Sequence, residues 1–447
     1  MPHLDGSTLS LAWALPFAGL LLSIALLPLL APKLWEHGFG AVAVVWVAAF
    51  LLPCAVRFGA GTAAAEIWHT AVSEYLPFII LVFALFVVAG GIRVVGNLIG
   101  TPATNTAILA LGSLAASFLG TTGAAMLLIR PLIRANEDRA HTSHVFVFFI
   151  FLVANIGGSL TPLGDPPLFL GFLRGVDFLW TMRALLGPMT LAVAILLLLF
   201  YCIDRYQWRR ETEPIESRAP RQIRIEGLHN VIYLAGIVAA VLASGLWTSG
   251  LSVPVGFGSA VSLESLARDA VLLGLGYLSF RTTAAGIRLE NAFTWTPIRE
   301  VAVLFAGIFV TMIPVLAILR AGRAGALAPL LAIVTGPDGR PVDAAYFWLT
   351  GGLSSFLDNA PTYLIFFDLA GGDPVSLMGP LARTLTAISA GAVFMGANSY
   401  IGNAPNFMVK AVCEENGIRM PSFFGYMLWS GCILVPLFGL LTLVFFT

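Results

Sequence analysis

Long apolar stretches separated by short polar loops dominate the hydropathy pattern of this chain. A helix needs about 20 consecutive apolar residues to cross the hydrocarbon core of a bilayer. Ten stretches approach that length, which predicts an all-α protein that crosses a membrane many times. The predicted spans are residues 11–31, 39–56, 76–97, 145–172, 181–203, 228–248, 266–280, 299–319, 384–413 and 425–446.

Two further apolar segments, residues 104–135 and 343–372, each contain a polar centre. An arm of about 14 helical residues rises roughly 21 Å, which is short of the roughly 30 Å hydrocarbon core. We therefore predict two re-entrant hairpins, each entering and leaving the membrane on one side. Their polar centres are Ser117–Gly123 and Ser354–Thr362.

Two of the predicted spans are interrupted by glycine, proline and polar residues, at Asn155–Pro167 and Gly396–Asn406. Proline removes a backbone donor and glycine loosens the backbone, so neither run is expected to stay helical throughout. Unwound backbone at membrane depth is tolerated only where it is buried in protein or lines a cavity. Both breaks are therefore predicted to lie inside the protein.

The hairpin centres and the breaks recur at one sequence offset. Ser117 to Gly164 and Ser355 to Gly402 are both 47 residues apart (164 − 117 and 402 − 355), and the offset between the two sets is 238 (355 − 117). Each half contains five predicted crossings, an odd number, which predicts two inverted repeats of the kind found in secondary transporters. The same offset aligns Thr161 with Ser399, Asp165 with Asn403, Pro167 with Pro405 and Phe169 with Phe407.

An arginine-rich linker, residues 204–227, joins the predicted repeats 1–203 and 228–447. Arginine and lysine concentrate on the cytoplasmic side of membrane proteins, so we place the linker in the cytoplasm. The loop Ser249–Leu266, which has no lysine or arginine, then lies outside, as do both termini. The first hairpin opens from the cytoplasm and the second from the exterior. The scheme predicts a multi-pass protein of the bacterial inner membrane.

Composition agrees with a membrane protein. The 447 residues are 58% hydrophobic and 11% charged, whereas soluble proteins carry about 25% charged residues. The net charge of zero gives no reason to expect a nucleic-acid partner, so the expected partners are the lipid bilayer and a small solute. No HExxH or GxSxG motif occurs in the predicted spans, so neither an enzyme nor a cofactor is predicted.

Asp358 and Asn359 lie at the tip of the second predicted hairpin. A carboxylate and an amide, with backbone carbonyls freed by unwinding, suit a hard cation such as Na⁺. The same carboxylate could carry a proton, because burial disfavours its charged form and a bound cation favours it. Asp358 could also cap the following helix, with Pro361 in the first turn. The two roles are compatible, and an acid at membrane depth is a functional candidate by default.

Asp165 follows the same logic in the first half. It precedes Pro166-Pro167, a sequence suited to a helix cap and first turn. Its repeat mate is Asn403, so one half has its acid in the broken span and the other has it in the hairpin. Capping alone does not require one acid in each half. We therefore predict that Asp165 and Asp358 carry the transported proton or cation.

Polar groups near the two acids in sequence are candidate oxygen ligands. Taken singly, such groups more often form hydrogen bonds within or between helices, and only their clustering at the breaks favours a binding role. The candidate binding residues are Thr121, Thr122, Asn155, Ser159, Thr161, Gly164, Asn359, Thr362, Asn398, Ser399, Asn403 and Asn406.

The hairpin centres and breaks resemble those of the ion-transporter superfamily, and the similarity covers nearly the whole chain. That superfamily contains NhaD-like sodium/proton antiporters, arsenite permeases and sodium-coupled dicarboxylate and citrate carriers. The chain is most similar to its NhaD-like or citrate-transport branch. The resemblance implies two inverted repeats, each with a hairpin and a broken helix, and a homodimer. The runs that carry it are Gly120–Met126, Asn155–Pro167, Ser355–Thr362 and Asn398–Asn406.

Two functions are compatible with these features. The first is sodium/proton antiport, because a cation and a proton that compete for one carboxylate are exchanged by linkage. The second is sodium- or proton-coupled symport of citrate or another di- or tricarboxylate, because helix N-termini can bind carboxylates. Two acids without a compensating arginine would repel such a substrate, so antiport is the principal expectation. A channel fits inverted repeats around a central site less well.

Overall fold

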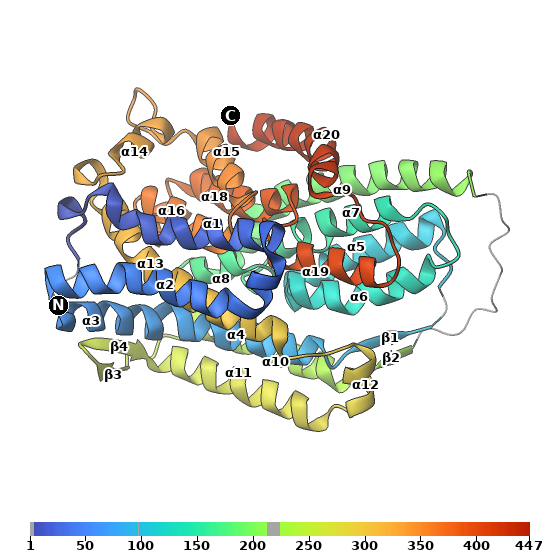
Figure 1. The fold of residues 1–447 in the computed structure, drawn as a ribbon, viewed down its shortest axis with the longest axis horizontal. Coiled ribbons are helices and arrows are strands. Elements are labelled where there is room, and N and C mark those ends of the chain that lie inside the picture. The colour runs from blue at the N-terminus through green and yellow to red at the C-terminus, as the bar shows by residue number, and fades with distance from the viewer. Residues whose placement is uncertain (1–3, 97, 212–223) are drawn as a thin grey trace.

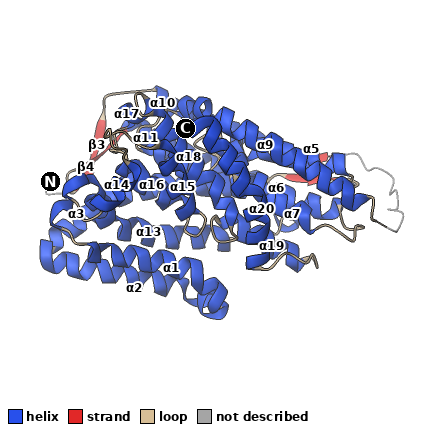
Figure 2. Ribbon diagram, turned by 90° about the horizontal axis from the view of Figure 1, so that it is seen from above, coloured by secondary structure: helices blue, strands red, loops and turns tan. Residues whose placement is uncertain are grey.

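The computed structural model describes residues 4–96, 98–211 and 224–447, and these are mostly helical (Figure 1). Within them, strands occur only in two small peripheral sheets (Figure 2). The strand β1 (Arg93–Val95) pairs antiparallel with β2 (Arg224–Glu226), and β3 (Ser252–Gly256) pairs with β4 (Ser259–Ser262). The prediction of an all-α membrane protein is therefore confirmed only as a mostly helical one, since these two sheets were not predicted.

Eight helical stretches in the described residues are long and apolar enough to cross a membrane. The chain is therefore a multi-pass membrane protein by helix length and hydropathy. Seven of the ten predicted spans coincide with one of these stretches. The eight are Leu11–Pro28, His37–Phe58, Ala60–Ala89, Pro102–Leu119, Phe178–Trp208, His229–Leu246, Thr296–Arg320 and Phe423–Phe446.

Most of these stretches are built on one long helix each. Several are longer than the predicted spans, because helices continue beyond the apolar core into the polar loops. The elements are η2 (Leu11–Ala14), α1 (Leu15–Leu30), α2 (Pro32–Phe58), α9 (Phe178–Trp208), α10 (His229–Leu246), α13 (Thr296–Arg320), α20 (Phe423–Leu441) and η7 (Thr442–Phe446).

The third stretch differs from its prediction at both ends. It runs without a loop through α3 (Ala60–Thr70), a π-helical turn η3 (Ala71–Tyr75) and α4 (Leu76–Ala89). Its first half was missed because polar side chains such as Glu74 lower the hydropathy; the carboxylate of Glu74 is paired with Arg174 at 2.7 Å. The predicted end at residue 97 was wrong, since the chain turns at Gly90 and then forms β1.

The predicted span 266–280 lies within α11 (Leu263–Thr282), which packs against α4 and α10. This helix is not among the eight stretches that are apolar enough to cross. It carries Arg268 and Asp269, which form an ion pair at 2.8 Å. The helix was correctly predicted, but its hydropathy does not by itself support a membrane crossing.

The predicted linker begins inside α9 rather than after it. Asp204 of α9 is fully buried, where it accepts hydrogen bonds from Arg139 (2.5 Å) and His144 (2.8 Å). Because these partners satisfy the carboxylate, the helix continues to Trp208. Residues 212–223 of the predicted linker lie outside the described residues.

Two helix pairs occupy the segments predicted as hairpins, but the first helix, Pro102–Leu119, is one of the eight stretches long enough to cross and exceeds the predicted arm of about 14 residues. In the first, α5 (Pro102–Leu119) and α6 (Thr121–Ala135) are joined at Gly120, whose φ of +76° suits glycine. In the second, α15 (Asp343–Ser354) is joined through a short turn to α16 (Asn359–Leu369). The helices of each pair pack against one another.

The two predicted helix breaks are present. The first lies between α7 (Ser143–Leu152) and α8 (Pro166–Leu173) and contains the short 3₁₀ turn η4 (Ile156–Ser159). Every residue from 153 to 165 is buried. The second break, after α18 (Ala382–Met395), contains η6 (Gly396–Asn398) and ends at α19 (Ala404–Glu415). In the second break residues 396–403 are buried except Asn398 and Ile401, which are half-buried, so both breaks lie largely inside the protein as expected.

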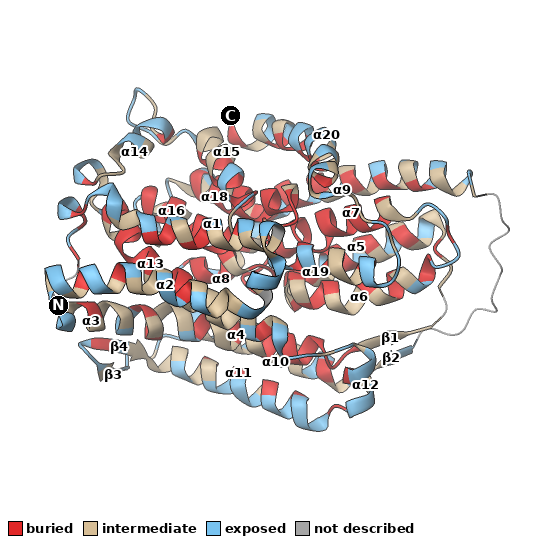
Figure 3. Ribbon diagram, viewed as in Figure 1, coloured by how far each residue is buried: buried red, intermediate tan, exposed pale blue. Residues whose placement is uncertain are grey.

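The long helices run roughly along one axis of the molecule (Figure 1). The N-terminus and β3–β4 lie at one end of this axis, and β1–β2 lies toward the other. Buried residues concentrate in the middle, around α5, α7, α8, α16 and α18 (Figure 3). The remaining short elements are η1 (Gly6–Thr8), α12 (Ala285–Glu290), η5 (Gly322–Ala324), α14 (Ala328–Val334) and α17 (Pro374–Met378).

Candidate functional site

Asp165 is the centre of the polar network between the two breaks. It occupies the N-cap position of α8, but its side chain makes no capping hydrogen bond. Its Oδ1 atom instead accepts from Thr121 Oγ1 at 3.0 Å and from Asn403 Nδ2 at 3.3 Å. Its Oδ2 atom accepts from Asn359 Nδ2. The side chain is only 1% exposed, so these three donors replace water around it.

Four helices begin at this one carboxylate. The helix α6 starts at Thr121 and α16 starts at Asn359, and both residues donate to Asp165. The helix α8 follows Asp165 itself, and α19 follows Asn403. Helix N-termini carry partial positive charge, whose effect is larger where water is excluded. The N-terminus of α8 acts through this charge rather than through its first N–H positions, because Pro166 and Pro167 have no N–H. These N-termini offset part of the cost of burying a negative charge, whether on Asp165 or on a bound anion.

Asparagine side chains tie the two breaks together. Asn155 Nδ2 donates to Asn406 Oδ1 at 2.6 Å. Asn406 in turn donates to the backbone oxygens of Gly396 and Ser399, both at 2.9 Å. These groups are fully buried, and a buried amide left without partners would cost about 1–3 kcal/mol. The predicted residues Asn155, Ser399 and Asn406 thus meet at one place, between segments about half the chain apart.

The hydrogen bonds that hold each helix pair against its break match at the offset of 238. Their donors are the hydroxyl groups predicted to line the site and those of two serines near the pair junctions. Local packing around the two breaks therefore corresponds position by position. The Thr161 hydroxyl donates to Ser117 O, and its repeat mate Ser399 donates to Ser355 O. In the same way, the Ser117 hydroxyl donates to Gly157 O and the Ser355 hydroxyl donates to Met395 O.

Asp358 is half-buried and caps α16, as the sequence predicts: its Oδ1 accepts from Ala360 N at 3.1 Å. Thr362 Oγ1 donates back to the Asp358 carbonyl at 3.0 Å. Asn359 Oδ1 is buried and has no hydrogen-bond partner in the described part of the chain. An amide oxygen left free beside a carboxylate has the chemistry of a hard-cation ligand.

The other predicted binding residues have mainly local roles. Ser159 donates to Ile156 O within its own turn. Asn398 donates to Ser355 Oγ at 2.9 Å, and its own Oδ1 has no partner among the described residues. The Gly164 carbonyl accepts from Thr121 N at 2.8 Å. These contacts position the breaks rather than reach the two acids.

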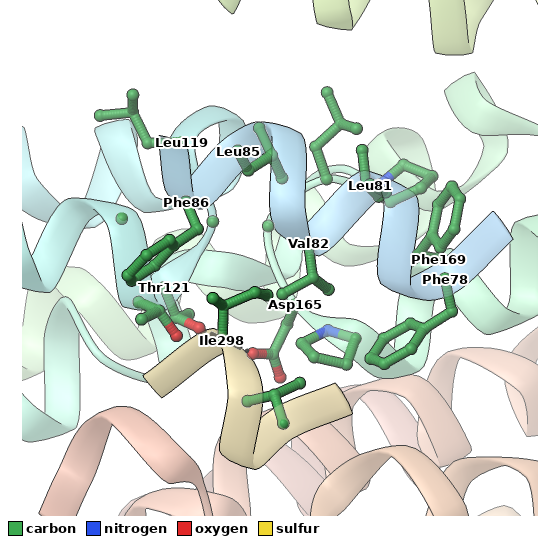
Figure 4. A pocket seen from close by; sticks show the side chains of 18 of the residues that line it. Phe78, Leu81, Val82, Leu85, Phe86, Leu119, Thr121, Asp165, Phe169 and Ile298 are labelled. Atoms are coloured by element: carbon green, nitrogen blue, oxygen red, sulfur yellow. Dashed lines mark hydrogen bonds between the residues drawn. The ribbon is translucent and has the colours of Figure 1, made fainter. Parts of the chain in front are cut away.

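Two cavities flank the acids. The first, which we call the Asp165 cavity, is about 80 Å³ and is lined by Asp165, Thr122 and side chains of α4 and α13. Figure 4 shows Asp165 between the α4 side chains and Ile298 of α13. The second, the Asp358 cavity, is about 280 Å³ and is lined by Asp358, Asn403 and residues of α1, α2 and α13. Val301 lines both cavities.

Glu300 of α13 also lines the Asp358 cavity and was missed in the sequence. It lies at the start of an apolar span, where an acid is usually an interfacial residue, and no repeat partner drew attention to it. A charged residue inside the predicted span 299–319 was the one sequence feature that could have pointed to Glu300.

Neither Asp165 nor Asp358 forms an ion pair with lysine, arginine or histidine in residues 4–96, 98–211 and 224–447. The same residues contain no group of three His, Cys, Asp or Glu side chains that could hold a metal ion. A cation here would therefore be held by single carboxylates with amide and carbonyl oxygens.

Comparison with known families gives a match over residues 6–446 to a family described as putative citrate transport. The chain belongs to this family. It is a family of transporters rather than of enzymes, in agreement with the sequence prediction. The expected citrate-transport branch is confirmed, whereas the NhaD-like branch is not supported by this match. A comparison with curated proteins finds no match.

Proposed function

We propose that this protein is a cation-coupled secondary transporter of citrate or another small di- or tricarboxylate. The observation that carries the proposal is the convergence of four helix N-termini on the buried carboxylate of Asp165. Helix N-termini bind carboxylates, and broken helices that meet inside the protein form the substrate sites of many secondary transporters. Membership of the citrate-transport family supports the same substrate class.

The two acids supply the coupling in this proposal. Asp165 and Asp358 would repel a carboxylate substrate unless Na⁺ or a proton neutralises them. A cation bound at Asp358 and Asn359 would raise the affinity for the anion, and the anion would raise the affinity for the cation by the same factor. Thr121 and Asn403, which donate to Asp165, would hold this acid in position.

The proposed architecture is two inverted repeats with re-entrant helix pairs. It is supported by the matched hydrogen bonds at the offset of 238 and by the break in each half. Alternating access requires a barrier on one side of the site. Stacked Phe78 and Phe305 (centroids 4.7 Å apart) contact Phe309, and we take these rings as the barrier because they line the Asp165 cavity, the Asp358 cavity and a third cavity respectively. That third cavity, the Glu74 cavity, is lined by Glu74, Phe309 and Arg320 and is about 560 Å³.

A sodium/proton antiporter remains the second candidate, and one observation favours it. No basic side chain is ion-paired with either acid in the described residues, so no dedicated counter-charge for an organic anion is in place. A cation and a proton could then compete for Asp358, which would force exchange.

Reconstituted proteoliposomes distinguish the two functions. We expect uptake of labelled citrate under an inward Na⁺ or proton gradient, and loss of this uptake in Asp358→Asn. The matched control is Asp338→Asn, which changes an exposed acid outside the three cavities. Proton movement on addition of Na⁺ without citrate uptake would overturn the symport proposal and support antiport.

A further inference from the structure

The Asp358 cavity contains a second carboxylate, that of Glu300 on α13. Most of its other lining residues are apolar or aromatic, including Trp35, Phe305 and Phe407. Two acids therefore face one partly enclosed space with few other polar groups. One of those, Asn403, also donates to Asp165, which connects this cavity to the central network.

Glu300 has no partner that would explain its position. It is half-buried, and no hydrogen bond or ion pair is made by its side chain within residues 4–96, 98–211 and 224–447. Glu74, by contrast, is also half-buried in the protein but pairs with Arg174 at 2.7 Å. Partial burial of an unpaired carboxylate is unfavourable unless another group compensates its charge.

Helix stability does not account for this acid either. The helix α13 begins at Thr296, so Glu300 lies beyond the first turn, where carboxylates interact best with the helix dipole. The residues three and four positions away are uncharged, so no helical ion pair is available: Thr296, Pro297, Val303 and Leu304.

Unused oxygen acceptors are present on both sides of the cavity. Asp358 uses Oδ1 to accept from Ala360 N, and its Oδ2 has no protein donor among the described residues. Both carboxylate oxygens of Glu300 also lack a protein donor among the described residues. Asn359, which follows Asp358 but does not line the cavity, has a buried Oδ1 without a partner in the same residues. Carboxylate and amide oxygens are the ligands that hard cations select.

We propose that Glu300 is a second cation-binding residue of the transport path and acts with Asp358 on one hard cation, such as Na⁺ or Mg²⁺. The inference rests on the proposed function in one respect, namely that Asp358 binds the coupling cation. Glu300 lowers the concentration of cation needed to occupy the cavity, because two carboxylates compensate the charge of the cation better than one does.

The test measures cation protection of each carboxylate from a carbodiimide in the purified, full-length protein. Modification of Glu300 and of Asp358 is quantified by mass spectrometry across titrations of NaCl and of MgCl₂, with choline chloride as the ionic-strength control. We expect one of the two salts to protect both residues with the same half-protecting concentration. In Glu300→Gln, the concentration that protects Asp358 should rise about tenfold, the equivalent of about 1.4 kcal/mol of binding free energy.

The matched control is Glu415→Gln, which changes an exposed acid outside the three cavities and should leave protection of Asp358 unchanged. Protection of Asp358 without protection of Glu300 would overturn the inference and leave the proposed function intact. Failure of both salts to protect either acid, together with absence of cation-dependent citrate uptake, would overturn both. The wild-type titration gives this answer even if Glu300→Gln does not fold.

Discussion

At the scale of the residue, the decisive feature is that Asp165 does not act as the helix cap its sequence suggests. Gly-Asp-Pro-Pro is well suited to capping, yet the carboxylate makes no capping bond and accepts from Thr121, Asn359 and Asn403. These donors come from three other segments of the chain. The acid is therefore held by tertiary contacts, which a capping role would not require.

Replacement of Asp165 by asparagine should abolish cation-coupled uptake. The asparagine amide would present an N–H₂ group to at least one of the three donors, and each unsatisfied buried group costs about 1–3 kcal/mol. We expect citrate uptake to fall to the background of empty liposomes. Thr121→Val removes only one donor and should reduce uptake less than Asp165→Asn. Equal uptake by wild type and Asp165→Asn would remove Asp165 from the mechanism.

The bridge between the breaks should be visible in stability. Asn155→Ala removes the donor to Asn406 and to Ile150 O and leaves buried acceptors unpaired. We expect a loss of about 1–3 kcal/mol in the free energy of unfolding, measured as a lower thermal midpoint in detergent. Ser159→Ala, whose hydroxyl bonds only within its own turn, should shift the midpoint less. The reverse order would contradict the bridging role.

At the scale of the element, each break is folded back on itself by close backbone contacts between its own glycines. A Cβ atom on Gly164 would lie 2.0 Å from Gly158 O, and one on Gly402 would lie 2.5 Å from Gly396 O. Both pairs of glycines are related by the offset of 238. The glycines are required because backbone approaches backbone, rather than because the helix must end there.

Gly402→Ala should therefore disrupt the second break. The added methyl group would also lie 2.9 Å from Ser354 O, so the backbone of α15 would have to move. We expect a clearly lower thermal midpoint and a loss of citrate uptake. The matched control is Gly431→Ala in α20, where no atom lies within 4 Å of the new Cβ atom. It should be neutral or stabilise by up to about 1 kcal/mol through helix propensity; a Gly402→Ala protein as stable as this control would refute the packing argument.

At the scale of the whole molecule, three cavities are arranged along α13. The Asp165 and Asp358 cavities contact residues from Pro297 to Ile308, and the Glu74 cavity contacts residues from Phe309 to Ala321. Phe78, Phe305 and Phe309 lie where these sets meet. In the proposed transporter these stacked rings are the barrier between the acids and the N-terminal end of the molecule.

Phe305→Ala should weaken this barrier. Loss of the ring removes the stack with Phe78 and joins the cavities, so Na⁺ should leak through reconstituted protein without citrate. The measurement is the decay of a Na⁺ gradient, followed with an entrapped indicator. Phe407→Ala, which lines the Asp358 cavity but lies outside the stack, is the control and should not leak. Identical decay rates for both variants would exclude the ring stack as the barrier.

The predicted orientation can be tested by labelling introduced cysteines in intact cells. We expect Ser249→Cys to react with a membrane-impermeant thiol reagent and Arg281→Cys to react only after permeabilisation, because arginine-rich loops remain cytoplasmic. Background labelling of native cysteines is reduced by replacing the exposed Cys202 and Cys432 with serine. Labelling of Arg281→Cys alone in intact cells would reverse the orientation and place both termini inside.

Hydropathy, together with the positions of glycine and proline, was enough to predict much of the secondary structure of this protein. It predicted most of the membrane-spanning helices, both breaks and the polar residues around them, because the cost of placing polar groups in lipid acts on each segment independently. It missed α3 and the following turn η3, where Glu74 is neutralised by Arg174, a residue 100 positions away. It also missed Glu300, since an isolated acid near a helix start has no pattern of its own.

Only the tertiary structure decided which of the predicted groups meet. Thr121, Asn359 and Asn403 converge on Asp165, whereas Ser159 and Thr362 bond locally, although all five have equally suggestive sequence contexts. The physical reason is that a hydrogen bond depends on distance and angle, and these follow from how helices far apart in the chain pack together. Local sequence determines where a helix ends; packing determines what its end faces.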